Sequence, residues 1–159
     1  MAADARFEDG GDKPLNLGAL DAEDLQIVSS LAQDAIFPAS EMQWRASERR
    51  FALLLNRFRW EDALAAERRG RAAERVQSLL VVDQVLSVAS QGVERGDADT
   101  ILSLLSVSFE PGEDGAGQVI LTLAGDGAIR LSVEALEVTL KDVTRPYLAP
   151  SGQVPQHQD

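Results

Sequence analysis

The sequence contains no cysteine and a single histidine, and this scarcity excludes several kinds of chemistry. Without cysteine there is no disulfide, no thiol nucleophile and no cysteine ligand for a metal. The histidine, His157, lies near the end of a proline-rich segment, where a general base would not be held in position. We therefore predict no catalytic residues, no metal site and no cofactor, and we do not expect an enzyme.

Basic residues and long apolar runs are also scarce. Lysine and arginine number 15 against 26 aspartate and glutamate residues, which gives a formal net charge of -11. A field of this sign repels phosphate backbones, so we predict no binding to nucleic acid. The longest apolar run, residues 79–88, is interrupted by Asp83 and Gln84 and is too short for a bilayer, which needs roughly 20 apolar residues. We expect no membrane association.

The composition favours one folded domain in the cytoplasm. The chain has 159 residues, 45% of them hydrophobic, which is enough for one sizeable core. Residues 1–13 are polar and lack the apolar core of a secretory signal, and residues 146–159 are rich in proline. We predict disordered tails at 1–13 and 146–159 and a single globular domain at 14–145.

Residues 118–143 predict a β-hairpin followed by a further strand. Apolar residues alternate at Val119, Leu121 and Leu123 and again at 129–133, and Gly125-Asp126-Gly127 between them suits a tight turn. The third run, at 136–140, has the opposite phase, so we expect a bulge or sharp corner at 134–135.

Other segments predict helices and short strands. A helix begins after Asp21, which can cap it, and ends near Gln33. Strands are expected at 35–38, 42–46 and 51–60, the last with a bulge at 56–57, and residues 77–93 are interpreted as two strand pieces joined by a kink at 83–84. Residues 62–75 are expected to form a mobile connection with a helical turn. A second capped helix is expected after Asp97 or Asp99, with its apolar face at 101–105, so that each half of the chain would be a helix followed by strands.

The predicted fold class is α+β. We expect a curved antiparallel sheet or partly open barrel of about eight strands, covered by two helices. A pleckstrin-homology-type barrel is the nearest fold analogy, although the helices here precede their strands, and the analogy carries no function.

Four segments in this order resemble a bacterial family of unknown function, domain-of-unknown-function family 2948. The segments are LGALDAEDLQIVSSLAQDA, RRFALLLNRFRWE, ILSLLSVSFEPGE and GAIRLSVEALEV. The resemblance covers about Leu15 to Val143, and the segment from Arg68 to Leu79 fits least well. It implies a compact domain in a bacterial cytoplasm and transfers no activity, ligand or catalytic residue.

One group of residues stands out as a candidate surface. On an extended chain Arg57, Arg59 and Glu61 would share one face, and Phe58 and Trp60 the other. Such arginines could bind a phosphate or carboxylate, arginine beside tryptophan could contact a protein, or the arginines could be ordinary strand-surface charges. The leading hypothesis is a non-catalytic interaction module that binds a protein partner or forms a homodimer; the alternative is a small-anion binding protein. The candidate residues are Arg49, Arg50, Arg57, Arg59 and Trp60.

Overall fold

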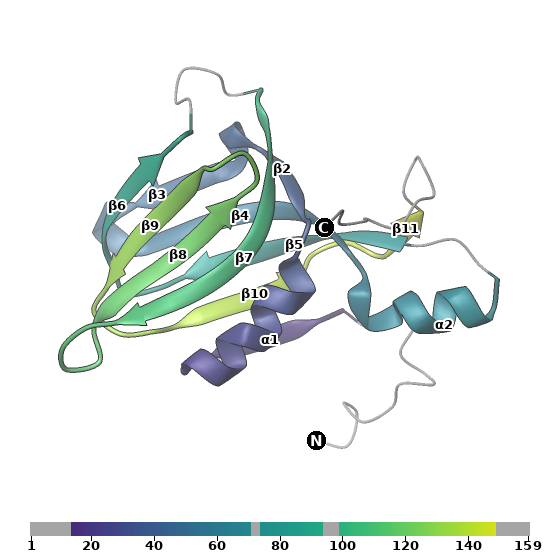
Figure 1. Ribbon diagram of the computed structural model, residues 1–159, viewed down its shortest axis with the longest axis horizontal. Coiled ribbons are helices and arrows are strands. Elements are labelled where there is room, and N and C mark those ends of the chain that lie inside the picture. Colours follow the sequence, from purple (N-terminus) through teal and green to yellow (C-terminus); the bar gives the residue numbers. More distant parts are fainter. Residues whose placement is uncertain (1–13, 71–73, 94–98, 149–159) are drawn as a thin grey trace.

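The protein folds as a curved antiparallel sheet with one helix packed into its opening (Figure 1). The computed structural model describes residues 14–70, 74–93 and 99–148. Within them the helices are α1 (Ala22–Ala32) and α2 (Ala63–Arg68), with short 3-10 turns η3 (Ala39–Glu41), η4 (Ala46–Glu48) and η5 (Trp60–Asp62). The strands are β1 (Asn16–Ala19), β2 (Ile36–Pro38), β3 (Met42–Arg45), β4 (Arg50–Phe58), β5 (Glu74–Val82), β6 (Val85–Gln91), β7 (Ile101–Pro111), β8 (Gly117–Leu123), β9 (Ala128–Val133), β10 (Val138–Asp142) and β11 (Tyr147–Leu148).

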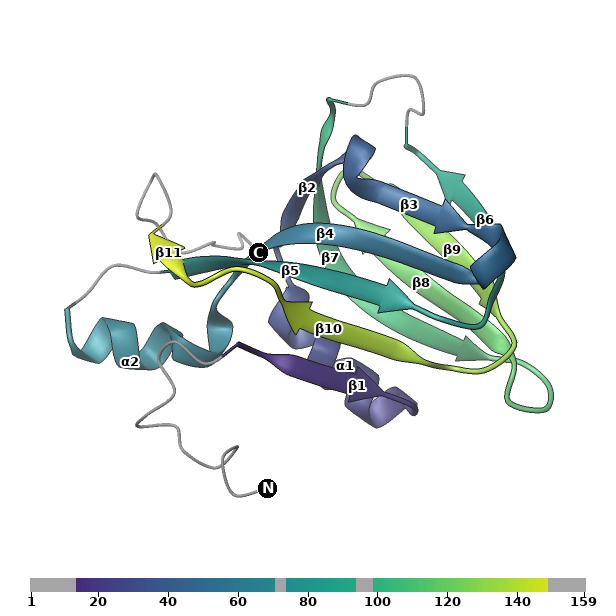
Figure 2. The same cartoon turned by 180° about the vertical axis from the view of Figure 1, so that it is seen from behind.

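The strand order is β1-β10-β5-β4-β2-β7-β8-β9-β6, with β3 paired to β4 and β11 paired to β5. The α+β class and the open antiparallel sheet are confirmed. The expected number of about eight strands is too low, because the sheet has eleven. Seen from behind, β3, β4, β5, β10 and β1 run side by side (Figure 2), and the sheet curves so that they face β7, β8 and β9.

The core lies between these two halves of the sheet. It is formed by inward-facing residues that alternate along each strand with outward-facing ones. Leu53, Leu55 and Leu80 come from one half, and Leu121 and Leu131 from the other, all almost fully buried. Helix α1 buries Leu25, Val28 and Ala32 against this core, mainly beside β7 and β1.

Several local expectations are confirmed. The side chain of Asp21 accepts a hydrogen bond from the backbone of Asp24 at 2.8 Å, and α1 ends before Gln33. The turn between β8 and β9 uses positive φ at Gly125 and Asp126. Residues 77–93 form two strands separated at 83–84, where Gln84 has φ 62°. The corner after β9 carries the chain to the other half of the sheet, where β10 pairs with β5.

The expected second helix at 101–105 is wrong, because these residues belong to β7. The two adjacent leucines, Leu104 and Leu105, mimic a helical face because the β7–β8 register shifts between Leu104 and Ser106. This irregularity returns Val107 to the inner face. Among the described residues, the second half of the chain therefore has no helix at this position to match α1 in the first half. The residues between 94 and 98, including Asp97, lie outside the described part of the chain.

The expected bulge at Asn56-Arg57 is also wrong. The β4–β5 register is unbroken from Phe51 opposite Val82 to Phe58 opposite Arg75. Arg57 therefore keeps the inward phase of Leu53 and Leu55 instead of turning outward. Regular structure continues to Leu148, past the predicted boundary at 145, because β11 pairs with β5. Residues 1–13 and 149–159, predicted to be tails, lie outside the described residues.

Candidate functional site

Arg57 is the largest fully buried side chain in the described structure, with 0% of its surface exposed. It reaches from β4 toward the middle of β5 and the end of β10. Its guanidinium group donates to both carboxylate oxygens of Glu61, at 2.9 and 2.8 Å. It also donates to Asp142 from Nε and Nη2, at 3.0–3.1 Å, and to Ser78 Oγ at 3.0 Å. We call Arg57, Glu61, Ser78 and Asp142 the Arg57 cluster.

The Arg57 cluster joins strands that are distant in the sequence. Ser78 Oγ donates to Asp142 Oδ1 at 2.6 Å, which links β5 to β10. The other carboxylate oxygen of Asp142 accepts from the backbone N–H of Leu15 at 2.9 Å, so the cluster also holds the chain that enters β1. Four segments of the fold therefore meet at one guanidinium group and its carboxylates.

The electrostatics of this cluster are those of a satisfied ion pair. Burial alone would lower the pKa of Arg57, but hydrogen bonds and opposite charge from Glu61 and Asp142 outweigh it and raise that pKa. Burial would raise the pKa of Glu61, but Arg57 outweighs this effect and lowers it. Both shifts favour the charged forms of Arg57 and Glu61, and no described buried side-chain polar atom lacks a hydrogen-bond partner. The cluster is thus equipped to stabilise the fold, not to exchange protons.

Arg59 and Trp60 are built into the same end of the molecule. Arg59 is 3% exposed and pairs with Glu74 and, at 3.3 Å, with Asp62. Trp60 packs edge-on against Phe58, with ring centroids 4.6 Å apart, and its indole N–H donates to the carbonyl of Gln33 at 2.9 Å. The expectation that Arg57 and Arg59 lie on an open strand face is therefore corrected. Strand β4 ends at Phe58 and η5 turns the chain, so both guanidinium groups are buried against carboxylates.

Arg49 and Arg50 lie on the surface at the other end of β4. Arg49 contacts Glu134 at 3.2 Å, and Arg50 contacts Asp83 at 2.8 Å. The hydrogen bond and charge of Asp83 raise the pKa of Arg50. The structure thus separates the five candidate residues into an exposed pair, Arg49 and Arg50, and an inner group, Arg57, Arg59 and Trp60.

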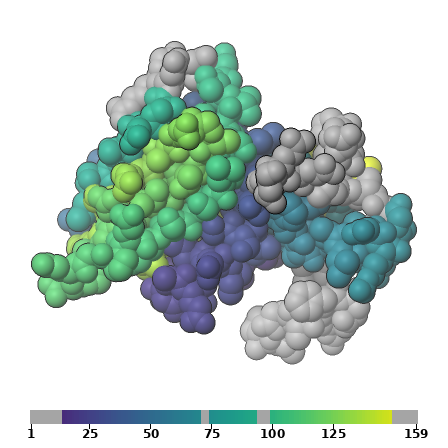
Figure 3. All heavy atoms as spheres, in the orientation of Figure 1, coloured from purple at the N-terminus to yellow at the C-terminus, as the bar shows by residue number. Residues whose placement is uncertain are grey.

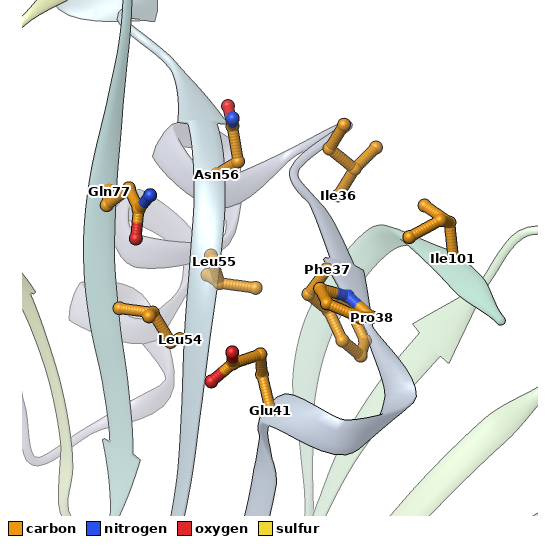
Figure 4. A pocket seen from close by; sticks show the side chains of 9 residues that line it. All are labelled: Ile36, Phe37, Pro38, Glu41, Leu54, Leu55, Asn56, Gln77 and Ile101. Atoms are coloured by element: carbon orange, nitrogen blue, oxygen red, sulfur yellow. The ribbon is translucent and has the colours of Figure 1, made fainter. Parts of the chain in front are cut away.

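A cleft opens where β2 and β4 diverge. The two strands pair only at Ile36 and Asn56, after which β2 follows β7 and β3 takes its place beside β4 from Leu53. The space between them has a volume of about 250 Å³. Its lining is shown in Figure 4 and consists of Ile36, Phe37, Pro38, Glu41, Leu54, Leu55, Asn56, Gln77 and Ile101.

Glu41 is the one charged residue lining this cleft, and its carboxylate points into the opening (Figure 4). No hydrogen bond or ion pair joins it to any described residue. The opposite end is closed by Asn56, whose amide nitrogen donates to the hydroxyl of Tyr147 at 2.6 Å and whose amide oxygen accepts from Arg75 at 3.3 Å. Ile36 and Ile101, 38% and 61% exposed, form an apolar wall. We call this site the Glu41 cleft.

No metal site accompanies either region: among residues 14–70, 74–93 and 99–148, no group of three or more His, Asp or Glu side chains is arranged to hold an ion. In the same part of the chain, no helix has the length and apolar character that a membrane span requires.

A family model described as "Protein of unknown function (DUF2948)" matches residues 15–157, which is most of the chain. The chain belongs to the DUF2948 family. This confirms the resemblance seen in the sequence. No curated protein and no solved structure gives a significant match.

Sequence reasoning about this DUF2948 protein missed Ser78, Asp142 and Glu41. The sequence does contain a signal for Ser78 and Asp142, because each occupies a position that points inward in the alternation of its strand. Ser78 precedes Leu80 and Val82, and Asp142 follows Val138 and Leu140. A polar residue at an inward position beside an inward arginine predicts an internal ion pair. Glu41 carries no such signal, because only the divergence of β2 and β4 places it over a cleft.

Proposed function

We propose that this protein is a non-catalytic protein-interaction module and that its Glu41 cleft receives a long basic side chain of a partner. The observation that carries the proposal is the Glu41 carboxylate, which borders a mainly apolar cleft and has no partner among the described residues. Glu41 is the one acidic or basic residue in the lining, so the cleft lacks the pair of groups that acid–base catalysis uses.

Arginine and lysine match this cleft because they combine an apolar stem with a charged end. The stem would lie against Ile36, Pro38 and Leu54, and the charged group would reach Glu41. Charge-assisted hydrogen bonds of this kind are roughly twice as strong as neutral ones. The net charge of -11 also favours a basic partner by attracting it over long distances.

The small-anion alternative receives less support from the geometry. Arg57 and Arg59 are buried and already hydrogen-bonded to carboxylates, so an anion would have to displace Glu61 or Asp62. Arg49 and Arg50 each have a carboxylate partner as well. A homodimer is opposed by the like charge of the two copies, and we place a basic partner first.

An NMR titration tests the role of Glu41. The probes are acetyl-Gly-Arg-Gly-amide and the same peptide with citrulline, which has nearly the shape of arginine but no charge. We expect the arginine peptide to shift the amide signals of Leu54, Leu55 and Asn56, and Glu41→Gln to weaken its binding about tenfold. The matched control is Glu113→Gln, an exposed glutamate in the β7–β8 turn. Equal binding of the citrulline peptide, or binding unaffected by Glu41→Gln, would overturn the proposal.

A further inference from the structure

Strand β7 leaves part of one backbone edge without a strand neighbour. On its other edge β7 pairs with β8 along 104–111, whereas β2 covers residues 101–103 and the two residues before β2 hydrogen-bond to Leu104. Beyond that point the neighbour of β7 is helix α1, and the space between them is a groove of about 440 Å³. The groove is lined by Ala22, Glu23, Leu25, Gln26 and Ser29 of α1 and by residues 106–109 of β7.

The hydrogen bonds identify which backbone groups face this groove. The N–H of Val107 donates to Ser29 Oγ of α1 at 2.8 Å, so it points away from β8. The N–H groups that point toward β8 belong to even-numbered residues, as the hydrogen bond from the Gly112 N–H to the Ala116 carbonyl shows. Because N–H directions alternate along a strand, Phe109 points the same way as Val107. Within the described residues, no hydrogen bond reaches the Phe109 N–H.

The ends of this open edge are defined by the sequence. The hydroxyl oxygen of Ser29 accepts from the Val107 N–H in the place where the carbonyl of a neighbouring strand would accept. Pro111, two residues after Phe109, has no N–H and marks the other end. Between them Phe109 offers both an N–H and a C=O to one residue of an incoming antiparallel strand, and the carbonyl of Val107 can accept from the residue two positions further along that strand.

The side chains beside this edge suit a strand of alternating character. Phe109 faces inward and is only partly buried. Its ring is fixed over Gly117, where an added Cβ would lie 2.8 Å from two ring carbons. A residue opposite Phe109 would meet this ring and the small side chain of Ala22. Glu23 lines the groove and is exposed at the start of α1. Figure 3 shows α1 (purple) beside the green β7–β8 hairpin on one face of the molecule.

We propose that the groove between α1 and β7 binds an extended, basic segment of another protein, which adds a short antiparallel strand to β7 at Phe109. Main-chain hydrogen bonds would supply the docking, and apolar residues at alternate positions would contact Phe109. The basic residues are indicated by Glu23 and by the net charge of -11. The same charge opposes a second copy of this chain as the occupant. This site is separate from the Glu41 cleft, with which it shares no lining residue.

The test uses the peptide acetyl-Lys-Val-Lys-Val-Lys-Val-amide and two N-methylated versions of it. When the valines face Phe109, their N–H groups point at β7 and the lysine N–H groups point away. We expect the parent peptide to bind and to slow hydrogen exchange of the Phe109 amide by about tenfold. Methylation of the valine nitrogens should abolish binding, and methylation of the lysine nitrogens should preserve it.

A pair of protein variants checks the location. Glu23→Gln should weaken binding severalfold, whereas Glu113→Gln, which removes the same charge from the β7–β8 turn, should not. The proposal is overturned if the parent peptide does not bind at about 1 mM, if both methylated peptides bind equally, or if the Phe109 amide exchanges at the same rate with peptide bound. Self-association of the free protein with protection of Phe109 would assign the edge to a second copy and would equally overturn it.

Discussion

Two parts of this protein place carboxylates in opposite environments. Glu61 and Asp142 have several hydrogen-bond partners, whereas Glu41 has none among the described residues. The first two share a buried guanidinium group, and Asp142 also binds a hydroxyl and a backbone N–H. Glu41 borders a cleft and has no partner among the described residues. Charged residues whose hydrogen-bonding groups are all used by neighbouring residues stabilise the fold but have few groups free to bind a ligand. An unsaturated carboxylate contributes little to stability and is available for binding.

The largest effect is expected from Arg57→Ala. This change leaves Asp142 buried without a cation and leaves Glu61 with only a 3.9 Å contact to Arg59, and breaking a buried ion pair in this way costs about 3–5 kcal/mol. Urea denaturation followed by circular dichroism measures the loss. The matched control is Arg130→Ala, whose exposed side chain contacts Gln118 and Glu110; it should change stability by less than about 1 kcal/mol. Equal losses for both variants would contradict the distinction.

A smaller effect is expected from Trp60→Phe at the same end of the molecule. The change keeps an aromatic ring but removes the indole N–H that donates to the Gln33 carbonyl. A neutral hydrogen bond of this kind contributes about 0.5–1.5 kcal/mol. Trp44→Phe is the matched comparison, because Trp44 is 37% exposed on β3 and no hydrogen bond joins its indole to a described residue. Denaturation curves that ranked Trp44→Phe as the more damaging change would contradict this account.

The pH dependence of stability sharpens the comparison further. Arg57 lowers the pKa of Glu61 in the folded state below its unfolded value of about 4.3. Glu61 therefore contributes stability that is fully present above that unfolded value and is lost as the pH falls through the lower, folded value. Urea midpoints measured from pH 6 to pH 3 should show Glu61→Gln below the unchanged protein at pH 6, with the difference shrinking toward pH 3. A difference that stays constant across this range would rule out the linkage.

The smallest effect on stability is expected from Glu41→Gln. Glu41 makes no hydrogen bond or ion pair with the described residues, and such surface substitutions usually change stability by less than about 0.5 kcal/mol. The same denaturation experiment checks it. A loss above about 1 kcal/mol would show that Glu41 supports the fold and would weaken its assignment to binding.

The elements that the sequence predicts correctly are those with a local signal. The cap at Asp21, the turn at Gly125 and the break at Gln84 each depend on residues close together in the chain. The class of the fold follows from these elements. The partners of each strand do not, because β1 pairs with β10 and β2 with β7, and no short-range pattern encodes those choices.

The errors at β4 and β7 have different physical causes. Arg57 continues the inward phase of Leu55, but a charged side chain suggests an outward position unless its partners are known. At β7 the adjacent Leu104 and Leu105 suggest a helix because the register shift that separates them depends on β8. The Arg57 cluster could be inferred in part from inward polar positions, whereas the Glu41 cleft and the open edge of β7 depend on how distant strands diverge.

The pairing of β1 with β10 has a consequence for biosynthesis. Strand β1 leaves the ribosome long before its partner β10, and Asp142 binds Leu15 across 127 positions. Strand β1 therefore has no partner while the intervening strands are synthesised, and it can pair only after translation has passed Asp142. Contacts between such distant residues close large loops and slow folding. A nascent chain stopped before Val138 would retain β4 and β5 but would leave β1 without its partner strand.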